Sequence, residues 1–241
     1  MLQAAEAAGL REICFTDHID YEVGVEKQIM VFDTDVYNAA YDDLRSRKLK
    51  IRRGMEFGIK PGNQADLKKD LQRRHFDFVL GSVHFVNEQD VYLEPFWKGM
   101  TVERATKLFL EETLACVQAH DDYDVLAHLT FISKGRAHPT HEPIYLKDCR
   151  EIGDEILKAL VRKGKGLEMN TSGVDRCGDY LPGVDFFRRF RELGGEIVTM
   201  GSDAHTWDRV GQYTNQACAI LKDIFGYVCT FEDRKPIFHK L

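Results

Sequence analysis

The chain has 241 residues, of which 44% are hydrophobic and 30% charged, and its formal net charge is −6. This composition is typical of a globular protein and excludes a disordered, collagen-like or coiled-coil chain. The acidic charge argues against general binding to nucleic acid or membranes, and no segment approaches the roughly 20 apolar residues of a membrane span. Residues 1–15 contain no basic segment followed by an apolar block, so we expect a cytoplasmic protein without a signal peptide.

Short apolar runs rich in β-forming residues alternate with segments of helical period. The clearest helix covers residues 101–120, with Thr101 as its N-cap. In chain order we expect a strand at 13–15, helix 35–47, strand 50–57, helix 63–74, strand 76–83, helix 101–120, strand 123–129, helix 148–161, strand 166–169, helix 183–193, strand 196–200, helix 211–221 and a further candidate strand at 227–231.

This alternation predicts an α/β fold with a mainly parallel sheet, either open and doubly wound or closed into a barrel. The sequence contains neither G-x-G-x-x-G nor a P-loop motif, so nucleotide-binding versions of the fold lack support. We find no repeat and no linker, and we expect residues 1–241 to form a single domain.

Residues able to bind metal follow most of the expected strands. These residues are His18, Glu56, His84, His128 and the pair Asp203 and His205. Functional groups gather at the carboxyl ends of parallel strands, so we expect these side chains to converge on one rim. Imidazole nitrogens and carboxylate oxygens without thiolates suit Zn²⁺, Mn²⁺ or Fe²⁺, and Glu56 has two oxygens with which to bridge two ions. The alternative is a set of mutually hydrogen-bonded polar groups in a barrel mouth.

Five motifs, in order, resemble those of the PHP (polymerase and histidinol phosphatase) family. They are Thr16-Asp17-His18, Gly54-Met55-Glu56, Gly81-Ser82-Val83-His84, Ala127-His128 and Gly201-Ser202-Asp203-Ala204-His205. The resemblance covers essentially the whole chain. Softer features, among them Phe96-Trp97-Lys98-Gly99 and Glu168-Met169-Asn170-Thr171-Ser172-Gly173, are most similar to the histidinol-phosphatase branch.

The resemblance implies a distorted barrel of seven parallel strands with two or three divalent ions at its carboxyl rim. Glu56 would bridge two ions, and His84 and His128 would complete the shell of one. Asp203 would bind the second ion, while His18 and His205 would bind the third. Asp17 would orient an imidazole.

The sequence departs from the family pattern at its start. The family's first strand carries a His-x-His pair, and no such pair occurs here. We therefore expect a barrel without its first strand, with an unpaired gap in the sheet and only one fully coordinated ion. Truncation of a normal enzyme and a degenerate form both account for the departure, and the intact later motifs favour truncation.

The implied reaction is hydrolysis of a phosphomonoester, most specifically L-histidinol phosphate in histidine biosynthesis. Asp203 or a nearby histidine such as His205 would accept the proton of the attacking water. Arg176 is our first choice and Arg136 our second for binding the phosphate of a small metabolite, because a guanidinium matches phosphate geometry.

Two other functions remain open at this point. One is a PHP phosphoesterase acting on nucleotides or nucleic acid, against which the charge of −6 weighs. The other is an inactive metal-binding remnant, or a partner that assembles with another chain. The sequence is also compatible with an oligomer.

Overall fold

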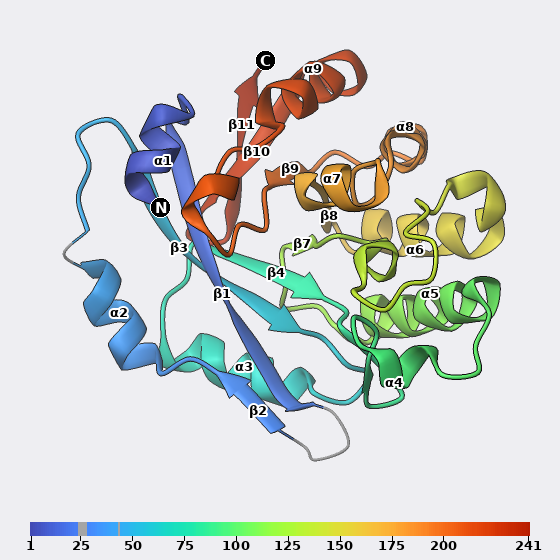
Figure 1. Cartoon of the computed structure of the whole chain (residues 1–241). Coiled ribbons are helices and arrows are strands. Elements are labelled where there is room, and N and C mark those ends of the chain that lie inside the picture. The colour runs from blue at the N-terminus through green and yellow to red at the C-terminus, as the bar shows by residue number, and fades with distance from the viewer. Residues whose placement is uncertain (24–27, 43) are drawn as a thin grey trace.

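The computed structural model describes residues 1–23, 28–42 and 44–241. Its main sheet has seven strands in the order β2-β1-β3-β4-β7-β8-β9, in which all neighbours are parallel except β1 and β2. The main-sheet strands are β1 (Glu12–Val23), β2 (Gln28–Val31), β3 (Lys50–Gly58), β4 (Phe78–Ser82), β7 (Val125–Leu126), β8 (Gly166–Asn170) and β9 (Val198–Gly201). The α/β class is confirmed, with six parallel strands in a curled, open sheet (Figure 1).

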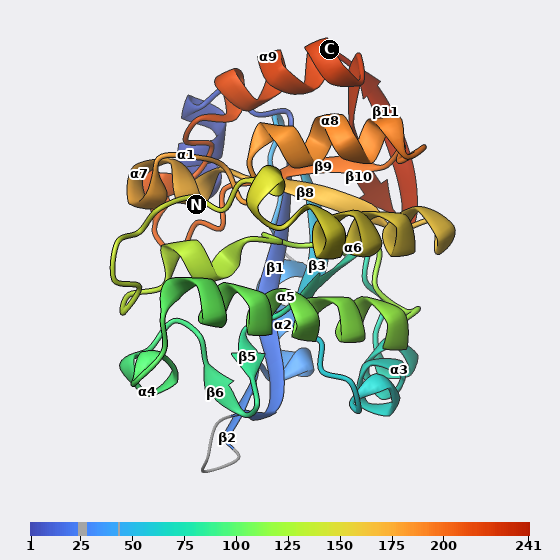
Figure 2. The same ribbon diagram turned by 90° about the vertical axis from the view of Figure 1, so that its right-hand side faces the viewer.

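Helices connect the parallel strands and cover the outer face of the sheet. Among them, α5, α6, α8 and α9 lie in a row, each in contact with the next (Figure 2). The helices are α1 (Leu2–Ala7), α2 (Thr34–Asp42), α3 (Gln64–Arg73), α4 (Glu94–Trp97), α5 (Val102–Ala119), α6 (Arg150–Arg162), α7 (Val174–Cys177), α8 (Val184–Glu192) and α9 (Thr214–Ile224). The expected Thr101 cap is confirmed, because its hydroxyl accepts a hydrogen bond from the Arg104 backbone N–H at 3.3 Å. No helix in the described part of the chain is long and apolar enough to cross a membrane.

The sheet has apolar cores on both faces. The larger core fills the space between sheet and helices and includes Met55, Phe57 and Phe109. The smaller core lies on the other face, where Phe78, Leu80, Val125 and Ala127 pack against Cys229 and Phe231. Side chains alternate between faces along a strand, so every second residue lies on the face of the small core. Toward the carboxyl ends of the strands, this face carries polar residues such as Glu56.

Two small hairpins lie outside the main sheet. Strands β5 (Phe85–Val86) and β6 (Gln89–Asp90) form one, and β10 (Tyr227–Glu232) and β11 (Lys235–Lys240) form the other. The candidate strand at 227–231 therefore exists, but it pairs antiparallel with β11 and supplies the apolar residues of the small core. Neither β5 nor β6 was expected, because these two-residue strands do not lie within an apolar run as β7 does.

The first strand, β1, is longer than the strand expected at 13–15. It was expected to end at Phe15, before the motif that contains His18, but β1 continues to Val23 because it pairs with β3 as far as Ile19 and with β2 from Ile19 onward. Among the described residues, no strand pairs with the free edge of β1 from Glu12 to His18, which agrees with the expected gap.

Candidate metal centre

The register between β1 and β3 brings His18 opposite Glu56. The His18 Nε2 lies 3.7 Å from Glu56 Oε2. Because side chains two residues apart share a face of a strand, Asp20 points to the same side as His18. Asp17, one residue before His18, points to the opposite side and accepts a hydrogen bond from the Tyr41 hydroxyl at 3.2 Å. The expectation that Asp17 orients an imidazole is therefore wrong, since the strand alternation directs Asp20 to that place.

Glu56 is the centre of a buried cluster. Its Oε1 lies 3.1 Å from His84 Nε2 and 2.9 Å from His128 Nε2. The side chains come from the ends of β3, β4 and β7, and each is less than one-tenth exposed. One donor atom from each of the three residues lies within 4.8 Å of the others. This spacing allows all three side chains to contact one ion.

The short distances within this cluster shift the pKa values of Glu56 and His128. Burial alone would raise the pKa of Glu56, but His18, His128 and His84 outweigh it and hold the pKa well below its ordinary value. Burial lowers the pKa of His128 more than Glu56 raises it. His128 is therefore neutral at pH 7, the form that binds a metal ion.

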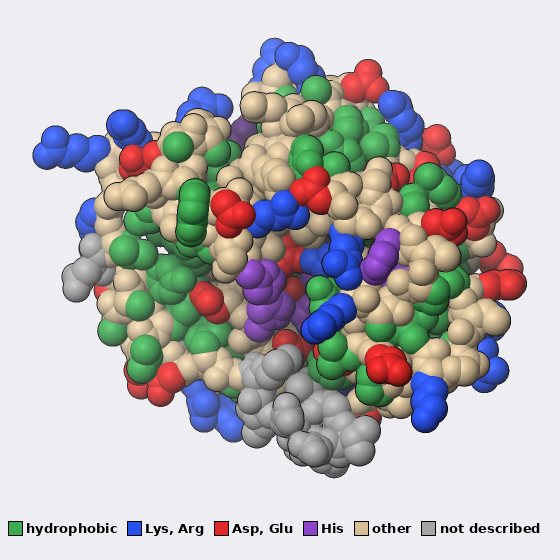
Figure 3. All heavy atoms as spheres, in the orientation of Figure 1, with side chains coloured by type: hydrophobic (Ala, Val, Ile, Leu, Met, Phe, Trp, Pro, Cys, Tyr) green, Lys and Arg blue, Asp and Glu red, His purple; other side chains and the backbone are tan. Residues whose placement is uncertain are grey.

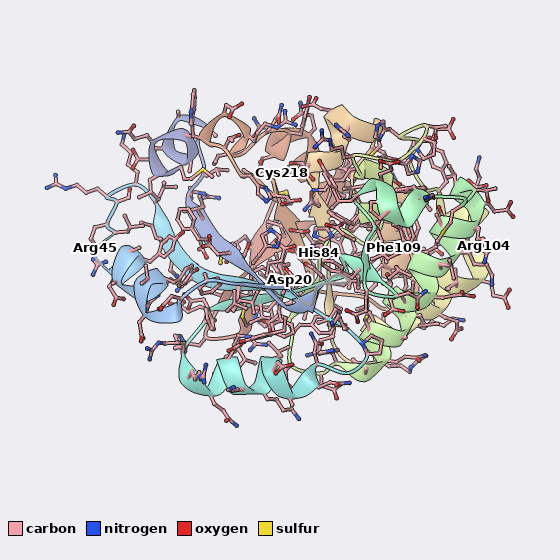
Figure 4. The ribbon with its side chains drawn as sticks, turned by 60° about the horizontal axis from the view of Figure 1, so that its bottom comes forward. Asp20, Arg45, His84, Arg104, Phe109 and Cys218 are labelled. Atoms are coloured by element: carbon pink, nitrogen blue, oxygen red, sulfur yellow. The ribbon has the colours of Figure 1, made fainter. Side chains whose placement is uncertain are left out.

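Asp20 was missed by the sequence analysis and belongs to the site. Its Oδ1 lies 3.2 Å from His84 Nδ1, and Figure 4 shows the two side chains together within the curl of the sheet. Burial alone would lower the pKa of His84, but Asp20 and Glu56 outweigh it and raise the pKa to about 10. The histidines conversely overcome the effect of burial on Asp20 and lower its pKa to about 2. His18, Asp20 and His84 form a second set of three closely spaced donors.

Asp203 and His205 lie in the loop after β9. The backbone of Asp203 has a φ of 48°, and its Oδ2 contacts the Lys134 ammonium and lies 3.4 Å from the Ser172 hydroxyl. The His205 side chain is 70% exposed, and its ring centroid is 5.6 Å from that of His18. Its Nδ1–H donates to the Asp203 carbonyl oxygen at 3.0 Å, which leaves Nε2 free to bind a ligand.

Glu168 on β8 supports two of these loops. Its Oε2 accepts hydrogen bonds from the His128 backbone N–H at 3.1 Å and from the Asn170 side chain at 3.0 Å. A Cβ at Gly201 would overlap the Glu168 carboxylate, so only glycine allows this approach. Burial raises the pKa of Glu168 to about 7. The segment that contains Glu168 resembles the histidinol-phosphatase branch, but the sequence pattern alone assigns Glu168 no role.

The site opens into a cavity of about 560 Å³ that is polar and aromatic. Figure 3 shows histidines gathered in a hollow with basic side chains beside them. Three cations line the cavity, namely Lys134, Arg176 and Arg209. Arg176 is exposed and has no ion-pair partner among the described residues. Arg136 is also exposed, but it does not line the cavity, because the turn Phe131–Lys134 directs Lys134 inward instead.

The donors fit a divalent metal ion. They are imidazole nitrogens and carboxylate oxygens, and no cysteine belongs to the sets of closely spaced donors among the described residues. Two buried atoms of the cluster, Asp20 Oδ2 and His128 Nδ1, have no hydrogen-bond partner in the described part of the chain. An uncompensated polar atom is costly in a protein interior, which supports the interpretation that these groups bind or orient around a further ligand.

Comparisons with known proteins show which proteins the chain is similar to. The chain is 33% identical over 202 residues to a probable histidinol-phosphatase of Clostridium acetobutylicum, covering 83% of this chain and 76% of that protein. It is 31% identical over 238 residues to the histidinol-phosphatase of Lactococcus lactis, covering 96% and 87%. A crystal structure of histidinol phosphate phosphatase from Lactococcus lactis, in complex with zinc, L-histidinol and phosphate, has a TM-score of 0.82 at 28% identity and covers 98% of this chain and 90% of that chain. The model of the PHP domain matches residues 1–172, and the chain therefore belongs to the PHP domain family.

Proposed function

We propose that the protein is a metal-dependent phosphomonoester hydrolase that converts L-histidinol phosphate and water into L-histidinol and phosphate. The observation that carries the proposal is Glu56 Oε1, which faces the Nε2 atoms of both His84 and His128 in a cavity with basic walls. The relatives named histidinol-phosphatase, and the similar structure that contains zinc, L-histidinol and phosphate, support this substrate.

We propose two or three divalent ions of zinc, manganese or iron. Glu56, His84 and His128 would hold one ion, and Asp203 together with Glu56 would hold a second. His18 and His205 would hold a third. When bound, such ions lower the pKa of a water molecule and offset negative charge on the phosphate.

The residues of the chain have separate tasks in this proposal. Lys134 and Arg176 would bind the phosphate oxygens, and Ser172 would hold the Lys134 ammonium through their 2.9 Å hydrogen bond. Arg209 is held by Asp175 at 2.6 Å and would contribute mainly its charge. Asp203 or His205 would take the proton of the attacking water, because both lie on the cavity wall.

The remaining proposals concern the protein as a whole. We propose that residues 1–241 act as one PHP domain in the cytoplasm, on a small phosphorylated metabolite. Nucleic acid is the second candidate substrate, and the charge of −6 disfavours it. A cavity of about 560 Å³ suits a small molecule better than a strand.

The test is release of phosphate from L-histidinol phosphate and from a single-stranded oligonucleotide, with added Zn²⁺ or Mn²⁺. We expect turnover of L-histidinol phosphate that chelation abolishes, and no cleavage of the oligonucleotide. Cleavage of the oligonucleotide alone would replace the proposed substrate with nucleic acid. Activity on neither substrate, in a folded and metal-loaded protein, would reject the hydrolase proposal.

A further inference from the structure

The walls of the cavity differ in charge. Lys134, Arg176 and Arg209 line one part, whereas the hairpin β5–β6 contributes Phe85 and Asp90 to another. Phe85 and Asp90 are direct partners across this hairpin, so their side chains lie on the same face. Asp90 is the acidic residue of the cavity that the proposed metal and phosphate chemistry leaves without a task.

Asp90 is held in place but is not neutralised. Its Oδ1 accepts a hydrogen bond from the Tyr92 backbone N–H at 2.8 Å, which fixes the side chain by a local turn. No lysine, arginine or histidine forms an ion pair with Asp90 within residues 1–23, 28–42 and 44–241. Burial raises the pKa of Asp90, although the neighbouring His84 opposes this effect. A half-buried carboxylate with one oxygen available is suited to accept a hydrogen bond from a ligand.

Aromatic rings connect this carboxylate to the basic part of the cavity. The Lys134 ammonium lies 5.1 Å from the centroid of Phe131, and Phe131 stacks against Tyr92 with centroids 6.2 Å apart. Tyr92 is in turn the residue whose backbone binds Asp90. The cavity wall thus carries a cation beside the Phe131 ring, the Tyr92 ring stacked on Phe131, and a carboxylate that the Tyr92 backbone holds. A ligand matching this order has a phosphate at one end and a flat polar ring with an N–H at the other.

We propose that Asp90 determines specificity by accepting a hydrogen bond from the N–H of the substrate's imidazole. This inference rests on the proposed function and adds to it the residue that recognises the end of L-histidinol phosphate remote from the reacting phosphate. Tyr92 and Phe131 line the wall along which the substrate lies, and Asp90 binds the edge of the imidazole. The phosphate remains with Lys134, Arg176 and the metal ligands.

The test compares Asp90→Asn with the wild type on four phosphomonoesters. Asparagine keeps an oxygen for the Tyr92 N–H but replaces the free carboxylate oxygen with an NH₂ donor. The substrates are L-histidinol phosphate, its analogue without the amine, L-alaninol phosphate (which lacks the imidazole) and p-nitrophenyl phosphate. Inhibition by the product L-histidinol is measured in parallel, because it reports binding without the chemical step.

We expect Asp90→Asn to lower kcat/KM by roughly 10- to 100-fold for the two imidazole substrates, as loss of a charged hydrogen bond predicts. The Ki of L-histidinol should rise by a similar factor. Values for L-alaninol phosphate and p-nitrophenyl phosphate should stay within about 2-fold of the wild type. Glu88→Gln is the matched control, because Glu88 lies in the turn of the same hairpin, outside this cavity, and should leave all four substrates unaffected.

Other results would overturn the inference. An equal loss on all four substrates would assign Asp90 to the metal centre or to stability, and no loss on any would remove it from substrate recognition. A loss confined to the substrates that carry the amine would show that the carboxylate binds the ammonium group instead. If the wild type hydrolyses none of the substrates, the proposed function itself fails, and this result is distinct from failure of the Asp90 inference.

Discussion

At the scale of single residues, Glu56 has the largest consequences, because His84 and His128 both face its Oε1. Glu56→Gln removes one negative charge and one metal-binding oxygen while conserving volume. We expect bound metal and turnover to fall together, with turnover reduced by at least about 100-fold, a loss of about 2.7 kcal/mol of transition-state stabilisation. Elemental analysis of the purified variant measures the metal, and Glu112→Gln, a half-buried acid outside the cluster, is the control. Unchanged metal content would contradict the role of Glu56.

His84 gives a prediction on pH. Its pKa in the metal-free fold is raised to about 10 from an ordinary value of 6.5, so protonated His84 stabilises the fold. The stabilisation is complete below pH 6.5 and is lost as the pH rises toward 10. We expect the Tm of the metal-free protein to fall over this window, and to fall less in His84→Gln. Equal slopes in thermal melts of the two proteins would contradict the ion pairs with Asp20 and Glu56.

The same titration has the opposite effect once metal is present. A metal ion binds the neutral imidazole and must displace the proton from His84. We therefore expect the affinity for Zn²⁺ to increase between pH 6 and 8, as measured by competition with a chromophoric chelator. Affinity that is independent of pH would show that His84 is not a ligand.

At the scale of elements, the length of β1 determines whether Asp20 reaches the site. Strand β3 makes room for it, because a Cβ at Gly58 would overlap the Asp20 carboxylate. We expect Gly58→Ala to displace Asp20 from His84, raise the Kd for metal and lower the free energy of unfolding by about 1–3 kcal/mol. Gly62→Ala, where an added methyl has no neighbour within 4 Å, should change stability by less than about 0.5 kcal/mol. Denaturant unfolding and metal titration of both variants test this. Equal behaviour would mean that Asp20 does not support the centre.

The strands and turns also explain which residues of the site could be predicted from the sequence. Glu56, His84 and His128 were predictable because parallel strands place their carboxyl ends on one rim, and each residue lies at the end of an expected strand. Asp20 could not be predicted, because Thr16-Asp17-His18 is polar enough to suggest a loop, and the strand reaches Val23 only through pairing with β3 and then with β2. Lys134 was passed over for Arg136, two residues further on. The short turn Phe131–Lys134 places Lys134, and not Arg136, in the cavity wall. The pattern of charges in the sequence does not reveal which side chain points inward.

At the scale of the whole molecule, the open sheet is held by a large outer core and a small inner core, and the metal centre lies where the strand ends meet. The proposed ions would link β1, β3, β4 and β7 and would bind only the folded chain, so they would stabilise it by mass action. Free Zn²⁺ at 100 times its Kd should add about 2.7 kcal/mol to the free energy of unfolding. Chelation should therefore lower the Tm, and readdition of metal should restore it. A Tm that does not respond to chelation or readdition would place the ions outside the fold's carboxyl rim.

The central claim is that Glu56, His84 and His128 contact a common divalent ion. An anomalous difference map from crystals grown with Zn²⁺ tests it most directly. We expect a peak at about 2.0–2.2 Å from one oxygen of Glu56 and from one nitrogen of each histidine. A fully occupied zinc found elsewhere, with these three side chains bound only to one another, would contradict the claim and the hydrolase mechanism built on it.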